Sequence, residues 1–186
     1  MSRFELRETA LAGLRVVRRQ AVADERGFFS RFFCAQELAA AGFVLPIAQI
    51  NQTCTKRRGA VRGLHYQNPP HSEDKFISCL RGEILDVAVD LRLGSPTFLR
   101  WHAEVLSAAN LTSLLVPQGF AHGFQTLSDD CELLYLHSRA FAPAAEAGLN
   151  VRDPALAIKW PLPIGDISER DAARAFIAGD FAGIST

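Results

Sequence analysis

The chain has 186 residues, of which 48% are hydrophobic and 22% charged, and this balance excludes a largely disordered or fibrous protein. Its 20 basic and 20 acidic residues give a formal net charge of zero, which argues against a nucleic-acid-binding protein. The longest nearly apolar run, residues 38–48, is too short to span a bilayer, and the charged N-terminus lacks the apolar core of a secretory signal. We therefore expect one cytoplasmic domain over residues 1–186, with no nucleic-acid or membrane partner.

The first segment, residues 1–44, is expected to hold N-terminal strands and one short helix. The helix covers residues 36–41, where the sequence has good helix formers, and Gly42 ends it.

The middle segment, residues 45–141, consists of short runs in which apolar and polar side chains alternate, separated by Gly, Pro, Asn or Ser. Around residue 87, for example, Val87 and Val89 lie on one face of a strand and Asp86 lies on the other. Predicted strands cover residues 47–55, 61–67, 75–80, 83–91, 98–106, 114–117, 122–127 and 131–139. So many short strands without long helices between them predict an all-β antiparallel sandwich or barrel.

The last segment, residues 142–186, is a C-terminal extension with a second helix. Ser168 is a suitable N-cap, and Glu169 and Asp171 are acidic residues in the first turn. Gly179 is predicted to end this helix.

Two amide side chains mark a possible ligand-binding face. Gln49 and Asn51 are two residues apart on a predicted strand, so both point to the same side. If that side is the barrel interior, a ligand rich in hydroxyl and carbonyl oxygens would satisfy them, because buried amides need partners. If it is the outer side, water satisfies them, and these two residues alone leave both interpretations open.

A regular strand would place Arg62 and His65 on opposite faces. Both can serve one site only if the strand bulges, and Gly63 is the residue best placed for a β-bulge. A lone histidine is more often structural than catalytic. Tyr135 lies in an otherwise apolar strand, where its hydroxyl needs a partner, either at the edge of the core or in a site.

A Pro-x-Gly-x-x-His pattern runs from Pro117 to His122 and resembles the second motif of cupin barrels. In many cupins such a histidine binds a metal together with a His-x-His pair and a glutamate. Here the region of the first motif has only His65 and His71, six residues apart. The sequence therefore favours metal-free chemistry over a metal site.

Several motifs in a fixed order cover most of the chain. They are DERGFF at 24–29, QxN at 49–51, RGxVRGLHYQ at 58–67, Lys75, RGE at 81–83, DVAVD at 86–90, GSPT at 94–97, PxGFAHGF at 117–124, LLY at 133–135 and SERD at 168–171. Each is weak alone, but together they resemble the dTDP-4-dehydrorhamnose 3,5-epimerase family of sugar-nucleotide epimerases.

The resemblance implies a cupin-like antiparallel jelly roll that forms a homodimer and uses neither a metal nor an organic cofactor. The implied substrate is a nucleotide-diphospho-4-keto-6-deoxy-hexose, inverted at C3, C5 or both. A base removes a proton next to the C4 ketone, an enolate forms, and an acid returns a proton to the opposite face.

The same resemblance assigns four catalytic roles. His65 matches the base, and Asp171 matches the carboxylate that orients it. Tyr135 matches the acid on the other face, and Lys75 the cation beside the enolate oxygen. The implied substrate-binding residues are Arg26, Phe29, Arg31, Gln49, Asn51, Arg62, His122, Phe141 and Glu146. Arg26 and Phe29 match an arm, within residues 1–44, that reaches the nucleotide of the neighbouring subunit.

Three positions depart from the family pattern. Arg31 replaces an acidic residue near the nucleotide base, Phe141 stands where tyrosine is frequent, and Leu136 replaces a common lysine. Two alternatives to the epimerase are a non-catalytic sugar-nucleotide-binding relative and a metal-dependent cupin enzyme that uses His65, His122 and an acid.

Arg31 predicts a changed nucleotide preference. A carboxylate can accept a hydrogen bond from the N3–H of thymine, whereas arginine only donates and suits the acceptors of cytosine or guanine. We expect CDP- or GDP-linked 4-keto sugars to be turned over at least as well as the dTDP-linked sugar. Side-by-side kinetics with the three nucleotides check this, and a clear dTDP preference contradicts it.

Overall fold

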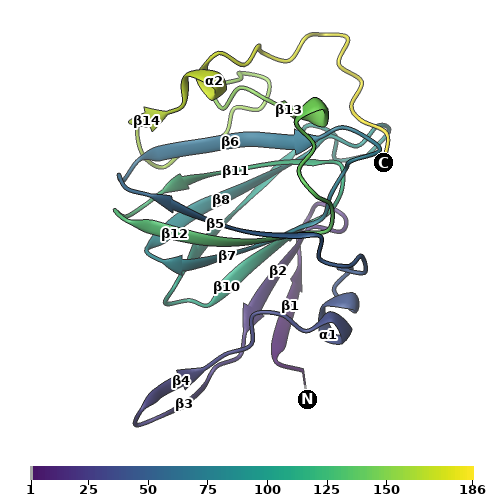
Figure 1. Ribbon diagram of the computed structural model, residues 1–186. Coiled ribbons are helices and arrows are strands. Elements are labelled where there is room, and N and C mark those ends of the chain that lie inside the picture. Colours follow the sequence, from purple (N-terminus) through teal and green to yellow (C-terminus); the bar gives the residue numbers. More distant parts are fainter. Residues whose placement is uncertain (1) are drawn as a thin grey trace.

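The computed structural model describes residues 2–186, and most of its strands belong to two facing sheets that form a barrel (Figure 1). Sheet A has the strand order β1-β2-β10-β7-β12-β5. Its strands are β1 (Phe4–Glu8), β2 (Arg15–Arg19), β10 (Thr112–Val116), β7 (Lys75–Arg81), β12 (Cys131–His137) and β5 (Gln49–Thr55). Sheet B has the order β13-β6-β11-β8-β9, with β14 beside β6. Its strands are β13 (Glu146–Gly148), β6 (Ala60–Gln67), β11 (Phe120–Thr126), β8 (Glu83–Asp90), β9 (Trp101–Ser107) and β14 (Asp166–Ile167).

The remaining elements are short. A hairpin of β3 (Val22–Asp24) and β4 (Gly27–Phe29) is separate from both sheets, and the α-helices are α1 (Ala35–Ala39) and α2 (Glu169–Ala172), with a 3₁₀ turn at Pro143–Ala145. The predicted jelly roll with short helices near both ends is confirmed. Each of the eight strands predicted in the middle segment is present, as β5 to β12, with ends shifted by at most a few residues.

The C-terminal helix is shorter than predicted, because α2 ends at Ala172 and not near Gly179. Side chains from an earlier loop bind the backbone groups that a longer helix would use. The amide of Asn150 donates to the carbonyl oxygens of Ala172 and Arg174, at 3.3 and 2.6 Å. Asp153 accepts from the backbone N–H of Ile177 at 2.5 Å. These tertiary contacts hold the chain against the barrel in an irregular conformation.

Strand β8 is buried on both faces. Its apolar face, with Val87 and Val89, points away from the barrel interior and packs against residues of the C-terminal extension such as Leu149 and Leu156. Its other face, which includes Asp86, points into the barrel. The C-terminal extension therefore covers the outer face of sheet B (Figure 1), and this packing brings α2 close to β6.

The predicted β-bulge at Gly63 is present. His122 pairs with His65 and Phe124 pairs with Arg62. Between these two pairs the chain advances three residues along β6 but only two along β11. Gly63 has a φ of +127°. The extra residue turns both Arg62 and His65 toward one cavity, which a regular strand would not allow.

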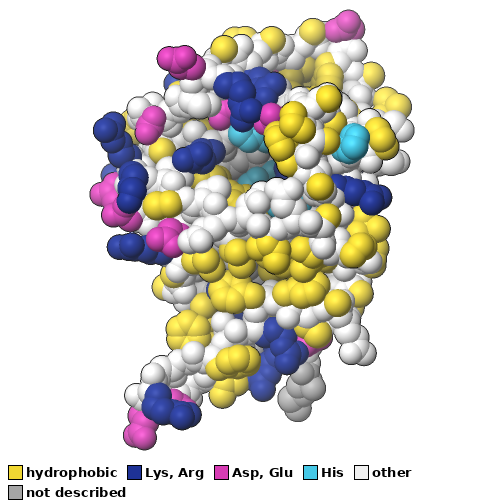
Figure 2. Space-filling view, viewed as in Figure 1, with side chains coloured by type: hydrophobic (Ala, Val, Ile, Leu, Met, Phe, Trp, Pro, Cys, Tyr) yellow, Lys and Arg dark blue, Asp and Glu magenta, His cyan; other side chains and the backbone are white. Residues whose placement is uncertain are grey.

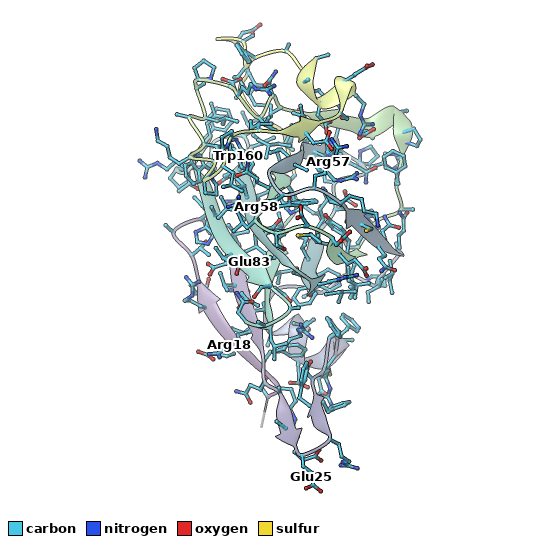
Figure 3. All side chains as sticks on the ribbon, turned by 90° about the vertical axis from the view of Figure 1, so that its left-hand side faces the viewer. Arg18, Glu25, Arg57, Arg58, Glu83 and Trp160 are labelled. Carbon is cyan, nitrogen blue, oxygen red and sulfur yellow. The ribbon has the colours of Figure 1, made fainter. Side chains whose placement is uncertain are left out.

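The β3–β4 hairpin extends away from the barrel (Figure 1). Figure 3 shows Glu25 at its tip, far from Trp160 of the C-terminal extension in the upper part of the molecule. Phe28 and Phe29 are 61% and 64% exposed, so the hairpin presents apolar side chains to its surroundings. No helix among residues 2–186 is both long and apolar enough to cross a membrane.

We predict that Gly63→Ala lowers the free energy of unfolding by about 3 kcal/mol or more, because left-handed strain and overpacking each cost roughly 1–3 kcal/mol. A Cβ atom at Gly63 would lie 2.6 Å from the Cα atom of Gly123. Urea melts of the two proteins measure the difference. Gly179→Ala is the matched control, since a Cβ atom there meets nothing within 4 Å. Equal stability losses in the two variants would contradict a special role for Gly63.

Candidate active site

A cavity of about 290 Å³ lies between the two sheets, and most of the predicted site residues meet there. Figure 2 shows a hollow between β5 and β6, with histidine side chains inside it and Lys or Arg side chains at its edge. The predicted site residues that line the cavity are His65, Lys75, Tyr135, Asp171, Asn51, Arg62, His122, Phe141 and Glu146. The barrel thus brings together residues from five strands and the C-terminal extension.

His65 and Asp171 form a hydrogen-bonded pair on the sheet B side. The Nε2 atom of His65 lies 2.7 Å from Oδ1 of Asp171. The other carboxylate oxygen accepts from the backbone N–H of Gly63 at 3.4 Å, and the Asp171 N–H donates to Ser168, the N-cap of α2, at 3.1 Å. The cap and the bulge therefore fix the carboxylate, and the carboxylate fixes the imidazole ring.

The surroundings of this pair favour a neutral histidine and an ionised carboxylate. Burial lowers the pKa of His65 against the opposing effect of Asp171, and the charges of Lys75 and Arg170 lower it further. Burial raises the pKa of Asp171, but hydrogen bonds from His65, Ser168 and the Gly63 N–H outweigh it and hold that pKa below its usual value. Near pH 7 the imidazole is thus unprotonated, which is the form that a general base requires.

Tyr135 lies on the sheet A side of the same cavity. Its ring stacks on His137 with centroids 5.9 Å apart, and it forms a T-shaped pair with His122 with centroids 6.0 Å apart. Burial raises the pKa of the Tyr135 phenol, and the nearby Asp86 carboxylate raises it further. The phenol is therefore protonated at neutral pH and can donate a proton.

Lys75 is the buried cation of the cavity. Its side chain is 8% exposed, and its ammonium donates to the backbone carbonyl oxygen of His65 at 3.2 Å. It also lies 3.3 Å from a carboxylate oxygen of Glu73. A buried ammonium with these partners is a fixed positive charge at the cavity wall.

His122 contributes a second histidine–carboxylate pair on the sheet B side. Its Nε2 atom lies 2.6 Å from Oδ1 of Asp86, a carboxylate whose side chain is fully buried. Burial raises the pKa of Asp86, and its Oδ2 atom has no hydrogen-bond partner among residues 2–186. Thr53 lines the cavity next to the Tyr135 phenol, and a hydrogen bond with its side chain lowers the pKa of that phenol without outweighing burial.

The cavity edge holds further polar groups. Arg62 donates to Thr55 at 2.9 Å, and Glu146 accepts from Arg170 at 2.9 Å. Asn51 accepts a hydrogen bond from Gln49 at 3.0 Å. Asn51 itself lines the cavity.

Four predicted residues do not line the cavity of this chain. Gln49 lies beside it and accepts from the backbone N–H of Phe141 at 3.0 Å. Arg26 and Phe29 lie on the hairpin that extends away from the barrel, where Arg26 pairs with Asp24 at 2.5 Å. Arg31 forms an ion pair with Glu37.

The structure adds Glu73, His137 and Arg170 to the cavity lining. Arg170 is part of the SERD motif and could have been noticed there. His137 is two residues after Tyr135 on the same strand, so period-two alternation carried a signal for it, whereas Glu73 precedes β7 and carried no such signal. Within residues 2–186, no group of three or more His, Cys, Asp or Glu side chains is arranged to hold a metal ion.

Comparison with known proteins shows the family of this chain. The family model described as dTDP-4-dehydrorhamnose 3,5-epimerase matches residues 8–178. A dTDP-4-dehydrorhamnose 3,5-epimerase of Streptomyces griseus is 39% identical over 168 residues, which are 89% of this chain and 83% of the relative.

Two solved structures share the fold. An epimerase of Legionella pneumophila, solved in complex with dTDP-4-keto-L-rhamnose, has a TM-score of 0.91 and 35% identity, covering 98% of this chain and 99% of its own. A 3′-monoepimerase of Streptomyces bikiniensis, solved with dTDP-quinovose, has a TM-score of 0.84 and 36% identity, covering 90% of this chain and 85% of its own.

Motif order, barrel topology and the match over nearly the whole chain lead to one assignment: this chain belongs to the dTDP-4-dehydrorhamnose 3,5-epimerase family.

Proposed function

We propose that this protein epimerises a nucleotide-diphospho-4-keto-6-deoxy-hexose at C3, C5 or both. The observation that carries the proposal is the placement of His65 on one sheet, paired with Asp171 of α2, and of Tyr135 on the facing sheet, around a single cavity. An inversion needs a base on one face of the sugar and an acid on the other, and this cavity offers one of each.

The chemistry starts from the C4 ketone, which acidifies the hydrogens on C3 and C5. Neutral His65 takes one of these protons while Asp171 stabilises the imidazolium that forms. The electron pair moves onto the ketone oxygen, and the resulting enolate is stabilised by the ammonium of Lys75.

Tyr135 then returns a proton from the opposite face. The carbon–hydrogen bond re-forms with inverted configuration and the ketone is restored. Before the next turnover, the imidazolium of His65 releases its proton to solvent and the phenolate left on Tyr135 takes one up. One proton is removed and one is added, so the sugar is neither oxidised nor reduced.

The remaining predicted residues would hold the substrate. We assign Arg62 and Asn51 to the sugar and diphosphate, together with His122, Phe141 and Glu146 at the cavity wall. Because Arg26, Phe29 and Arg31 lie away from the cavity of their own chain, we infer that they contact the nucleotide in the cavity of a partner subunit. The exposed apolar hairpin supports a homodimer in which the two arms are exchanged.

Incubation of a 4-keto-6-deoxy sugar nucleotide with the protein in heavy water tests the proposed reaction. We expect deuterium at C3, C5 or both by proton NMR, and a rate at least about 100-fold lower in His65→Asn, since a general base typically contributes 10²–10⁴-fold. The control is His71→Asn, an exposed histidine outside the cavity. Exchange at the full rate in His65→Asn would show that His65 is not the base. Loss of exchange on treatment of the wild-type protein with a chelator would favour the metal-dependent alternative.

The pH dependence of kcat/KM tests the state of the histidine. Since burial lowers the pKa of His65, we expect activity to fall only below about pH 6.5, the ordinary histidine pKa. Asp171 raises that pKa, so Asp171→Asn should move the acid limb to still lower pH and also reduce the plateau. An acid limb that moves to higher pH in Asp171→Asn would contradict the assigned pair.

A further inference from the structure

A third histidine–carboxylate pair lines the same cavity and has no role in the steps above. The Nδ1 atom of His137 lies 2.9 Å from Oε2 of Glu73. The other oxygen of that carboxylate, Oε1, lies 3.3 Å from the ammonium of Lys75. The three side chains are 14%, 8% and 8% exposed, so the chain His137–Glu73–Lys75 lies within the protein wall and not in open solvent.

The register of sheet A explains why these residues meet. Lys75 on β7 pairs directly with His137 on β12, and Tyr135 is the next inward-facing residue of β12. The His137 ring lies nearly parallel to the Tyr135 ring, at an interplanar angle of 18°. The ring of His137 thus packs against Tyr135, the proposed acid. Its Nδ1 atom contacts Glu73, the carboxylate that pairs with Lys75.

Glu73 is the only group among residues 2–186 whose side chain links Lys75 to another titratable residue. Burial raises the pKa of Glu73, but the hydrogen bond from His137 and the charge of Lys75 outweigh it and hold that pKa below its usual value. The carboxylate is therefore ionised and accepts from both neighbours. Because a lysine ammonium on a four-carbon stem is flexible, its place depends on how firmly its partners are held.

We propose that Glu73 and His137 are positioning residues for Lys75: His137 anchors one oxygen of the Glu73 carboxylate so that the other holds the ammonium at the cavity wall. This inference rests on the proposed function, in which Lys75 stabilises the enolate. In this proposal the Nδ1–H of His137 is the group that holds the Glu73 carboxylate. The stacking of the His137 ring on Tyr135 contributes less to the position of Lys75.

Two substitutions separate the anchor from the ring. His137→Phe keeps an aromatic ring against Tyr135 but removes the donor to Glu73. His137→Asn loses the ring, yet its amide nitrogen can take the place of Nδ1 and donate to Glu73. Deuterium wash-in kinetics with a 4-keto-6-deoxy sugar nucleotide, with kcat and KM measured separately, report on each variant, and melting temperatures report on folding.

We expect His137→Phe to lower kcat about 10-fold with KM changed less than about twofold, because misplacing a catalytic group slows the chemical step more than binding. His137→Asn should retain at least about half of the wild-type kcat by the same argument. Glu73→Gln should also lower kcat about 10-fold, and adding His137→Phe to it should cost little more, since both act through one chain of contacts.

His102→Phe is the matched control, since it removes a histidine that is paired with Glu104 at 3.3 Å outside the cavity. Equal kcat losses in His137→Phe and His137→Asn, or an unchanged kcat in folded His137→Phe, would overturn the inference. If His137→Phe does not fold, the kcat of Glu73→Gln is the test. An unchanged kcat in Glu73→Gln would overturn the inference. Absence of exchange in the wild-type protein would instead contradict the proposed function.

Discussion

The hydrogen bond between His65 and Asp171 is the contact on which the rest of the site depends. It joins residues that are 106 positions apart, and three features of the fold must be right for it to form. The bulge at Gly63 turns His65 inward, the Ser168 cap sets the first turn of α2, and the apolar face of β8 anchors the C-terminal extension over sheet B. The extension is therefore part of the proposed active site, since it supplies the carboxylate that pairs with the histidine.

The two walls of the cavity are chemically opposed. On the sheet B side, burial and nearby cations keep His65 unprotonated, whereas on the sheet A side burial and the Asp86 carboxylate keep the Tyr135 phenol protonated. Environments that push the pKa values of two groups apart distinguish a base from an acid. The buried pairs around them hold these charges in fixed places, so little reorganisation is required when charge develops on the sugar.

Much of the barrel was predictable from the sequence, because period-two alternation between turn residues marks each strand from β5 to β12. Even the bulge was predictable, because residues three apart on a regular strand face opposite sides. Arg62 and His65 could share a cavity only if the strand bulged at Gly63. The length of α2 was not predictable, because Asn150 and Asp153 bind its potential continuation through tertiary contacts. The contact of His137 with Glu73 was also hidden, because it depends on the register between β7 and β12. The proposed role of the hairpin residues Arg26 and Phe29 in a partner's site stays a prediction, because both lie away from the cavity of their own chain.

The central claim is that His65 and Tyr135 act on opposite faces of one sugar, and the configuration of the product of Tyr135→Phe in heavy water tests it most directly. The account predicts that this variant still exchanges hydrogen for deuterium, because the base is intact, but that the deuterium returns on the face from which the proton left, with the original configuration retained. Inversion at the wild-type rate in Tyr135→Phe would contradict the account, because the acid would then have to be another group.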